Sequence, residues 1–185
     1  MGPLRIRLSG YGGQGIVLAG VIVGQAAVLD GKNAVQTQSY GSESRGGACK
    51  ADIIISDEDI YEIEPISFDC LVAMSTAAYK KYITRLKSGG KLIVEKAVAP
   101  DGDLDCDRYT IAATRMAEEN FGRKIMGNMV MIGFMSTIIG SPSHMSMKHS
   151  IRENVPEGTE EDNVKAFDLG HREGLRFSGE KGDKQ

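Results

Sequence analysis

The chain has 185 residues, of which 41% are hydrophobic and 25% are charged, and its net charge is −3 at pH 7. This length suits one domain of ordinary size, and this composition is typical of a globular protein rather than a disordered one. The slightly negative charge does not favour binding to nucleic acid or to an anionic membrane surface. We therefore expect neither kind of partner.

The three cysteines, Cys49, Cys70 and Cys106, are far apart and form no CxxC pair. This spacing predicts neither a disulfide framework nor an iron–sulfur or zinc ligand set, so we expect no metal site and a reduced, cytoplasmic protein. The N-terminus lacks the apolar run of a signal peptide. The most apolar stretch, residues 125–139, is shorter than the roughly 20 residues that span a bilayer and contains Asn128, which indicates a buried helix.

Short apolar strands alternate with helices through the first two thirds of the chain. The pattern predicts strands over 4–8, 34–38, 51–56, 70–74, 91–95 and 109–111, and helices over 16–29, 76–86 and 113–120. Such alternation is typical of βαβ units. We therefore expect an α/β fold that is Rossmann-like, with a mainly parallel sheet flanked by helices.

The last third changes character after the apolar helix predicted over 125–140. Residues 141–149 and 155–162 are polar and indicate loops around short helices, and the sequence from residue 178 onward resembles a frayed tail. There is no internal repeat. We expect a single α/β domain over 1–177 with a helical C-terminal extension, followed by a flexible tail over 178–185.

A glycine-rich loop lies between the first predicted strand and the first predicted helix. Residues 10–15, GYGGQG, have the GxGxxG spacing. In this context glycines permit a tight turn, and the helix N-terminus offers free N–H groups to a phosphate. We expect Gly12, Gly13, Gln14 and Gly15 to contact phosphate. The competing interpretation is a tight turn that binds no ligand.

Two familiar phosphate-binding classes fit this loop poorly. A nicotinamide or flavin dinucleotide site also predicts an acidic residue at the end of the second strand, about 20 residues on. That strand ends in Gln36-Thr37-Gln38, and Asp30 comes too early, so an NAD(P)-dependent oxidoreductase is disfavoured. No GK[ST] follows the glycines, which excludes a Walker P-loop.

A second polar, glycine-rich segment, residues 38–50, follows the second predicted strand. Loops at the carboxyl ends of neighbouring parallel strands meet over one crevice, so this segment should approach the first loop. Arg45 and Lys50 could neutralise phosphates there, and Ser39 could add a polar contact. The competing interpretation is a solvated loop without a ligand. Cys49 lies in this segment, and we expect a small packing residue rather than a reactive thiol.

These two segments together resemble a known family. SGYGGQGIVLAG, followed by DGKNAVQTQSYGSESRGGACKADIIIS, is similar in order and spacing to the γ subunit of 2-oxoacid:ferredoxin oxidoreductases. The resemblance continues more weakly through Asp69–Ser75 and Gly127-Asn128-Met129, and covers about the first 140 residues. The segment QTQSYG is more similar to the γ subunits of the 2-oxoglutarate type than to those of the pyruvate or branched-chain 2-oxoacid types.

The resemblance implies an enzyme subunit without complete chemistry of its own. The family's complexes convert a 2-oxoacid, coenzyme A and oxidised ferredoxin to acyl-CoA, CO2 and reduced ferredoxin. This chain lacks a GDG…NN thiamine diphosphate motif, since Asp101-Gly102-Asp103 has no preceding glycine and no paired asparagines, and it lacks cluster-binding cysteines. The resemblance therefore implies thiamine diphosphate and iron–sulfur clusters in partner subunits, α and β, with αβγ and αβγδ assemblies both left open.

The family role implied for this chain is assembly of the complex and part of the coenzyme A site, with no catalytic residue. A pyrophosphate and a 3′-phosphate suit a glycine loop at a helix N-terminus flanked by Ser39, Arg45 and Lys50. The alternative from another class is a free-standing nucleotide-binding sensor or regulatory module. The sequence leaves open which 2-oxoacid is used.

Overall fold

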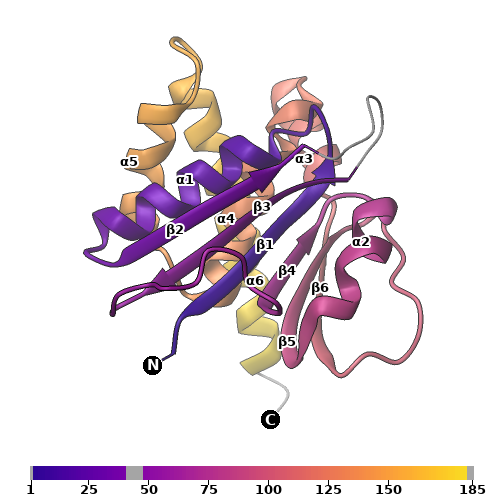
Figure 1. Cartoon of the computed structure of the whole chain (residues 1–185). Coiled ribbons are helices and arrows are strands. Elements are labelled where there is room, and N and C mark those ends of the chain that lie inside the picture. The colour runs from indigo at the N-terminus through magenta and orange to yellow at the C-terminus, as the bar shows by residue number, and fades with distance from the viewer. Residues whose placement is uncertain (1, 41–47, 183–185) are drawn as a thin grey trace.

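Six strands form one sheet in the order β2-β3-β1-β4-β5-β6 (Figure 1) in the computed structural model, which describes residues 2–40 and 48–182. The strands are β1 (Leu4–Tyr11), β2 (Asn33–Ser39), β3 (Ala48–Ser56), β4 (Phe68–Ala73), β5 (Leu86–Glu95) and β6 (Cys106–Ile111). Pairing is parallel between β1 and β4, β4 and β5, and β5 and β6. The predicted mainly parallel α/β sheet is confirmed.

Strand β3 runs antiparallel to both of its neighbours, β1 and β2. The connection from Ser39 to Ala48 explains this direction, because a parallel return needs a crossover of about a dozen residues or more. Since β3 opposes both, β2 and β1 run the same way, and their carboxyl ends, at Ser39 and Tyr11, lie at the same edge of the sheet. The two glycine-rich segments therefore start from one edge, as the sequence predicts.

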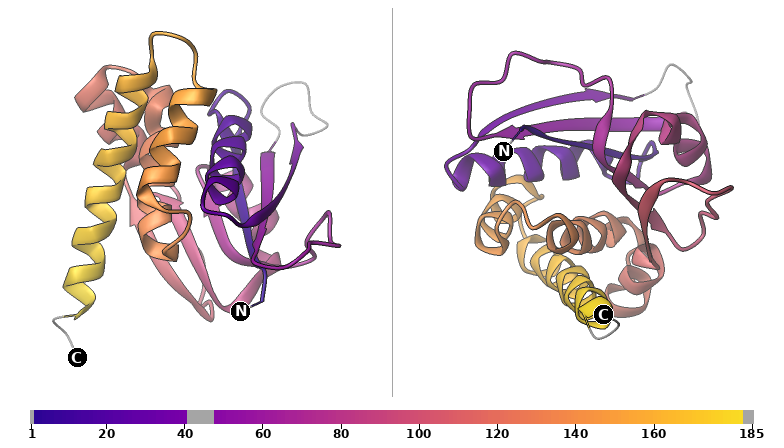
Figure 2. Two further views of the ribbon diagram at one scale, coloured as in Figure 1. Left: turned by 90° about the vertical axis from the view of Figure 1, so that its left-hand side faces the viewer. Right: turned by 90° about the horizontal axis from the view of Figure 1, so that it is seen from below.

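The helices are α1 (Ile16–Leu29), α2 (Thr76–Tyr82), α3 (Ala113–Phe121), α4 (Gly127–Ile139), α5 (His144–Asn154) and α6 (Glu160–Gly182). Figure 2 shows that α1, α3, α4, α5 and α6 gather on one face of the sheet. The main hydrophobic core lies between these helices and the sheet, and a smaller core lies under α2 on the other face. The two faces are thus covered very unequally.

Helix α4 is the apolar segment that the sequence predicts to be buried, and its residues 127–136 are buried. It packs closely against α6 because glycines meet at the contact. A Cβ atom at Gly133 would overlap the backbone carbonyl of Phe167, and one at Gly170 would overlap that of Val130. Among the described residues, no helix is both long enough and apolar enough to cross a membrane.

Two predicted boundaries differ from the structure. The helix expected over 76–86 ends at Tyr82, and after a short 3₁₀ turn the chain enters β5 at Leu86. Residues 88–90, expected to close the helix, therefore lie inside a strand, while Arg85 donates hydrogen bonds to the carbonyls of Pro65 and Ile66. Helix α6 continues to Gly182, past residue 178, where we expected the tail to begin.

Candidate functional site

The glycine-rich loop makes a turn that only glycine adopts readily. Gly13 has φ of 91° and Gly15 has φ of 70°, both in the left-handed region where an L side chain is strained. The backbone N–H of Gln14 donates to the carbonyl of Tyr11 over 3.2 Å and closes the turn between β1 and α1. The predicted strand–glycine loop–helix arrangement is therefore present.

Gln14 holds this loop in place. Its side-chain Oε1 accepts a hydrogen bond from the backbone N–H of Tyr11 at 2.6 Å, and its Nε2 donates to the carbonyl of Met74 at 3.3 Å. The first bond spans the turn, and the second ties the loop to the residue after β4. Both ends of the Gln14 amide are hydrogen-bonded within the protein, so this side chain positions the loop.

A cavity of about 380 Å³ opens beside the loop, within the size range of small-molecule sites. It is lined by residues from the loop and α1, from the end of β2 and start of β3, from the approach to α4, and from the start of α6. These are Tyr11, Gly12, Gly13, Gly15, Ile16, Val17, Leu18, Tyr40, Cys49, Arg123, Ile125, Met126, Asn128, Pro156, Thr159 and Asn163.

The N-termini of α1 and α4 give this cavity a positive character. Neither helix has a side-chain hydrogen bond from its N-cap residue, Gly15 or Met126, and neither has an acidic residue in its first turn. The helix dipole favours an anion at both ends, although in α4 the backbone N–H of Gly127 already donates to the carbonyl of Lys124 and that of Met129 to Oδ1 of Asn128. Helix α6 differs, because its first turn holds Glu160, Glu161 and Asp162.

Arg123 adds a full positive charge at the cavity wall. Its side chain is exposed and makes no hydrogen bond or ion pair with any other residue in the described ranges. A guanidinium with unused donors can bind a phosphate through two parallel hydrogen bonds. Together with the two helix ends, it makes this cavity suited to an anionic ligand.

Apolar and aromatic side chains form much of the remaining wall. Tyr11 and Tyr40 are exposed and line the cavity, while Cys49 is buried at its inner side. Burial raises the pKa of the Cys49 thiol above its ordinary value. The thiol is therefore held neutral at physiological pH, as a packing residue would be.

The structure brings together only part of the predicted phosphate site. Gly12, Gly13 and Gly15 line the cavity, whereas Gln14, Ser39 and Lys50 do not. Ser39 ends β2 and pairs in register with Lys50, next to the lining residue Tyr40. Arg45 lies outside the described residues.

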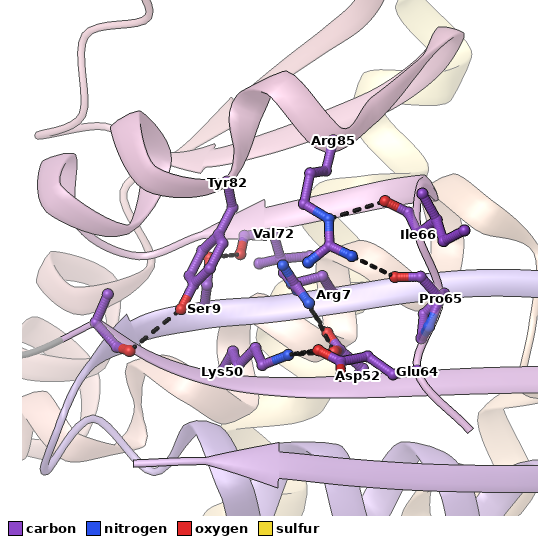
Figure 3. A network of polar contacts seen from close by, with 11 residues as sticks. Arg7, Ser9, Lys50, Asp52, Glu64, Pro65, Ile66, Val72, Tyr82 and Arg85 are labelled. Carbon is purple, nitrogen blue, oxygen red and sulfur yellow. Dashed lines mark hydrogen bonds and ion pairs between the residues drawn. The ribbon is translucent and has the colours of Figure 1, made fainter. Parts of the chain in front are cut away.

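Lys50 faces the opposite side of the sheet from the cavity. Its Nζ lies 3.0 Å from Oδ2 of Asp52 and 2.7 Å from Oε1 of Glu64 (Figure 3). Alternate residues of a strand point to opposite faces, so Lys50 and Asp52 share one face while Cys49 occupies the other. In this arrangement Lys50 neutralises carboxylates within the protein.

Arg7 completes this buried polar network. Its Nε and Nη2 donate to the two carboxylate oxygens of Asp52 at 2.5 and 2.7 Å, and both side chains are almost fully buried (Figure 3). The guanidinium also lies over the rings of Phe68 and Tyr82, with its Cζ 4.0 and 4.5 Å from the ring centroids. This cluster is structural, since the sheet and α2 cover it.

Sequence reasoning missed Arg123, Thr159, Asn163 and the two tyrosines of the cavity. The late segment Gly127-Asn128-Met129, part of the family resemblance, was the available signal that the start of α4 belongs near the glycine loop. Within the described ranges, no group of three or more His, Cys, Asp or Glu side chains could hold a metal ion.

The chain is similar to known proteins over most of its length. The family model for pyruvate ferredoxin/flavodoxin oxidoreductases matches residues 5–173. The chain is 48% identical over 171 residues to the 2-oxoglutarate synthase subunit KorC of Methanocaldococcus jannaschii, which covers 90% of this chain and 91% of the relative.

Two solved structures have the same fold. The γ subunit of a keto/oxoacid ferredoxin oxidoreductase from Geobacter sulfurreducens superposes with a TM-score of 0.86 at 38% identity, over 95% of this chain and 98% of the other. A 2-oxoglutarate:ferredoxin oxidoreductase from Magnetococcus marinus gives a TM-score of 0.86 at 23% identity, over 95% of this chain but 32% of that longer chain. The chain belongs to the pyruvate ferredoxin/flavodoxin oxidoreductase family.

Proposed function

We propose that this chain is the γ subunit of a 2-oxoacid:ferredoxin oxidoreductase that acts on 2-oxoglutarate, and that its cavity holds phosphate groups of coenzyme A. Identity to a 2-oxoglutarate synthase subunit over nearly the full length of both chains supports the enzyme class and the substrate. The observation that carries the ligand is the cavity where Arg123 and the N-terminal ends of α1 and α4 converge.

In this proposal the complex transfers the acyl group of the decarboxylated 2-oxoacid to coenzyme A and passes the electrons to ferredoxin. Thiamine diphosphate and iron–sulfur clusters belong to the α and β subunits, with or without a δ subunit. The complex works in the reducing cytoplasm. This chain helps to bind coenzyme A and to assemble the complex, and it supplies no catalytic residue.

The residues of the cavity suit the nucleotide end of coenzyme A. Gly12 and Gly13 let a phosphate approach the backbone, and the first N–H groups of α1 point toward the space beyond Gly15. Arg123 offers charge-assisted hydrogen bonds. Tyr11 and Tyr40 present ring surfaces that suit an adenine. Held there, the nucleotide would leave its flexible thiol arm free to reach a partner subunit.

The test uses the assembled complex and steady-state kinetics with a viologen as electron acceptor. Gly12→Asp places a carboxylate at the cavity wall, and a Cβ atom at residue 12 meets no atom within 4 Å. We expect the KM for coenzyme A to rise at least about tenfold by charge repulsion, with the KM for 2-oxoglutarate unchanged. Gly12→Ala is the matched control and should stay near the original value.

Arg123→Ala should also raise the KM for coenzyme A. Arg45→Ala tests the other arginine that the sequence predicts to contact phosphate. An unchanged KM for coenzyme A in Gly12→Asp and Arg123→Ala would show that the cavity does not hold this cosubstrate. If instead the purified chain is a stable homodimer with a bound nucleotide and no larger partner, the sensor alternative is correct.

A further inference from the structure

The face of the sheet opposite the main helical layer is covered thinly. Helix α2 lies over one part of it, and the segment between β3 and β4, residues 57–67, crosses in front of β1 and β3 (Figure 1). The view from below places this β3–β4 segment on the side away from α1, α4, α5 and α6 (Figure 2). In the described residues α2 is the only α-helix on this face: it contacts parts of β1 and β3, and the β3–β4 segment crosses these strands further along.

The β3–β4 segment is held firmly by its own acidic side chains and backbone. Glu62 pairs with Arg5 at 2.7 Å, and Glu64 pairs with Lys50 at 2.7 Å. Arg85 donates through Nε to the carbonyl of Ile66 and through Nη2 to that of Pro65, both at 2.8 Å (Figure 3). These contacts fix the segment against the sheet, although Glu64 itself stays largely exposed to water.

The same anchoring leaves large apolar side chains facing outward. Tyr61 is 92% exposed, Ile63 is 72% exposed and Ile66 is 82% exposed. These apolar side chains are thus as exposed to water as the charged side chains of the same segment, which is unusual for large apolar groups. Large exposed apolar side chains close together in the sequence of a fixed segment are typical of a protein–protein contact.

We propose that this apolar patch, Tyr61, Ile63 and Ile66, docks a larger subunit of the same oxidoreductase, and the proposal rests on the function proposed above. The partner that we propose is the subunit that corresponds to the part of longer relatives outside the fold of this chain. In the Magnetococcus marinus protein the same fold makes up 32% of one chain, so it is covalently attached to the rest. In the Methanocaldococcus jannaschii subunit KorC the matched region makes up 91% of the chain, and a subunit of that length needs a noncovalent surface in place of that attachment.

Charge next to the patch indicates the chemistry of the partner surface. Glu58 and Asp59 are exposed and form no ion pair in the described part of the chain. We therefore expect an apolar partner surface rimmed by lysine or arginine side chains, since complementary charge steers association. Because the segment is already fixed, docking orders few additional groups, which favours affinity.

The test measures binding of the full chain to its co-expressed larger subunits, by gel filtration of the complex and by titration of the separated chains. We expect the variant Tyr61→Ser/Ile63→Ser/Ile66→Ser to bind at least about tenfold more weakly. The matched control is Met145→Ser/Leu175→Ser, which removes exposed apolar side chains of α5 and α6. The control should bind as tightly as the unchanged chain.

Thermal unfolding of the isolated variants checks the fold, and the exposed positions predict little change in Tm. Equal binding by the patch variant and the unchanged chain would overturn the docking proposal alone. Failure of the unchanged chain to bind any larger subunit would instead overturn the proposed function. If the isolated chain dimerises and the patch variant is monomeric, the occupant is a second copy and the proposed partner is wrong.

Discussion

The side-chain amide of Asn128 donates a hydrogen bond to the backbone carbonyl of Gly15 over 3.2 Å. This contact joins the first turn of α4 to the residue that precedes α1. The other end of the amide, Oδ1, accepts from the backbone N–H of Met129 at 2.8 Å. Two helix ends that lie far apart in the sequence are thereby held beside one cavity.

Gly15→Ala should destabilise the protein more than Gly13→Ala. Both glycines have positive φ, which costs about 1–2 kcal/mol for an L side chain. At Gly15 a Cβ would also overlap the Asn128 side chain, whereas at Gly13 it meets no atom within 4 Å. Urea denaturation of both variants measures the difference in unfolding free energy. Equal losses would mean that Asn128 moves aside without cost.

Asp52→Asn should lower the unfolding free energy by about 3–5 kcal/mol, because it leaves the buried Arg7 guanidinium without its counter-charge. Glu62→Gln is the matched control: it breaks the partly exposed pair with Arg5 and should cost about 1 kcal/mol or less. Urea denaturation measures both. Similar losses in the two variants would contradict a special role for the buried pair.

Replacing both partners, as in Arg7→Met/Asp52→Leu, should restore much of the stability that Asp52→Asn removes. Well-packed apolar residues can substitute for a buried ion pair because no charge remains to be desolvated. The same urea titration measures this recovery. A double variant no more stable than Asp52→Asn would show that the hydrogen bonds and ring contacts of Arg7 stabilise more than its desolvation costs.

Stability should fall in mildly acidic solution partly because of His171. Burial lowers its pKa below the ordinary value, and the neighbouring His144 and Lys148 lower it further against the opposing effect of Asp168. The native state thus favours neutral His171. This contribution is present above the ordinary histidine pKa of about 6.5 and is lost as the pH falls through the lowered native pKa.

The measurement is Tm from about pH 7.5 to about pH 5.5. His171→Gln should lose less Tm over this range than the unchanged protein. His149→Gln is the control, since His149 is exposed and contacts Glu153 one turn away; its profile should follow that of the unchanged protein. Parallel profiles for all the proteins would argue against the contribution from His171.

The cysteines should react with iodoacetamide in the order of their exposure and pKa. Cys106 is partly exposed at the start of β6 and should be alkylated first. Burial raises the pKa of Cys70 to about 12, so it should stay unmodified until the protein unfolds. Cys49 should react slowly, and more slowly still when a ligand fills the cavity that it lines.

Peptide mass spectrometry over time gives the three rates. Adding coenzyme A to the assembled complex should slow only Cys49 if the cavity is its site. Rapid alkylation of Cys49 in the native protein would mean that its thiol is more accessible and more acidic than its burial indicates.

The local pattern of residues determined most of the fold. Apolar runs of strand and helix length predicted the alternating elements, and α1 begins and ends at the predicted residues. The glycine loop was predictable because its spacing specifies a local turn. The GGQG and QSYGSESRGG segments together indicated the family, because each motif is a continuous run of residues that can be read directly from the sequence.

Tertiary structure decided what surrounds the loop. Arg123, Asn128 and Thr159 reach the cavity only because α4 and α6 pack against the same end of the sheet as α1. Because alternate residues of β3 point to opposite faces of the sheet, the Lys50 side chain lies beside Asp52 and away from the cavity. Such long-range juxtapositions depend on how elements pack, whereas a turn or a helix depends on neighbouring residues. The order of residues along the chain therefore revealed the glycine-rich loop, and the packing of distant helices determined which residues surround it.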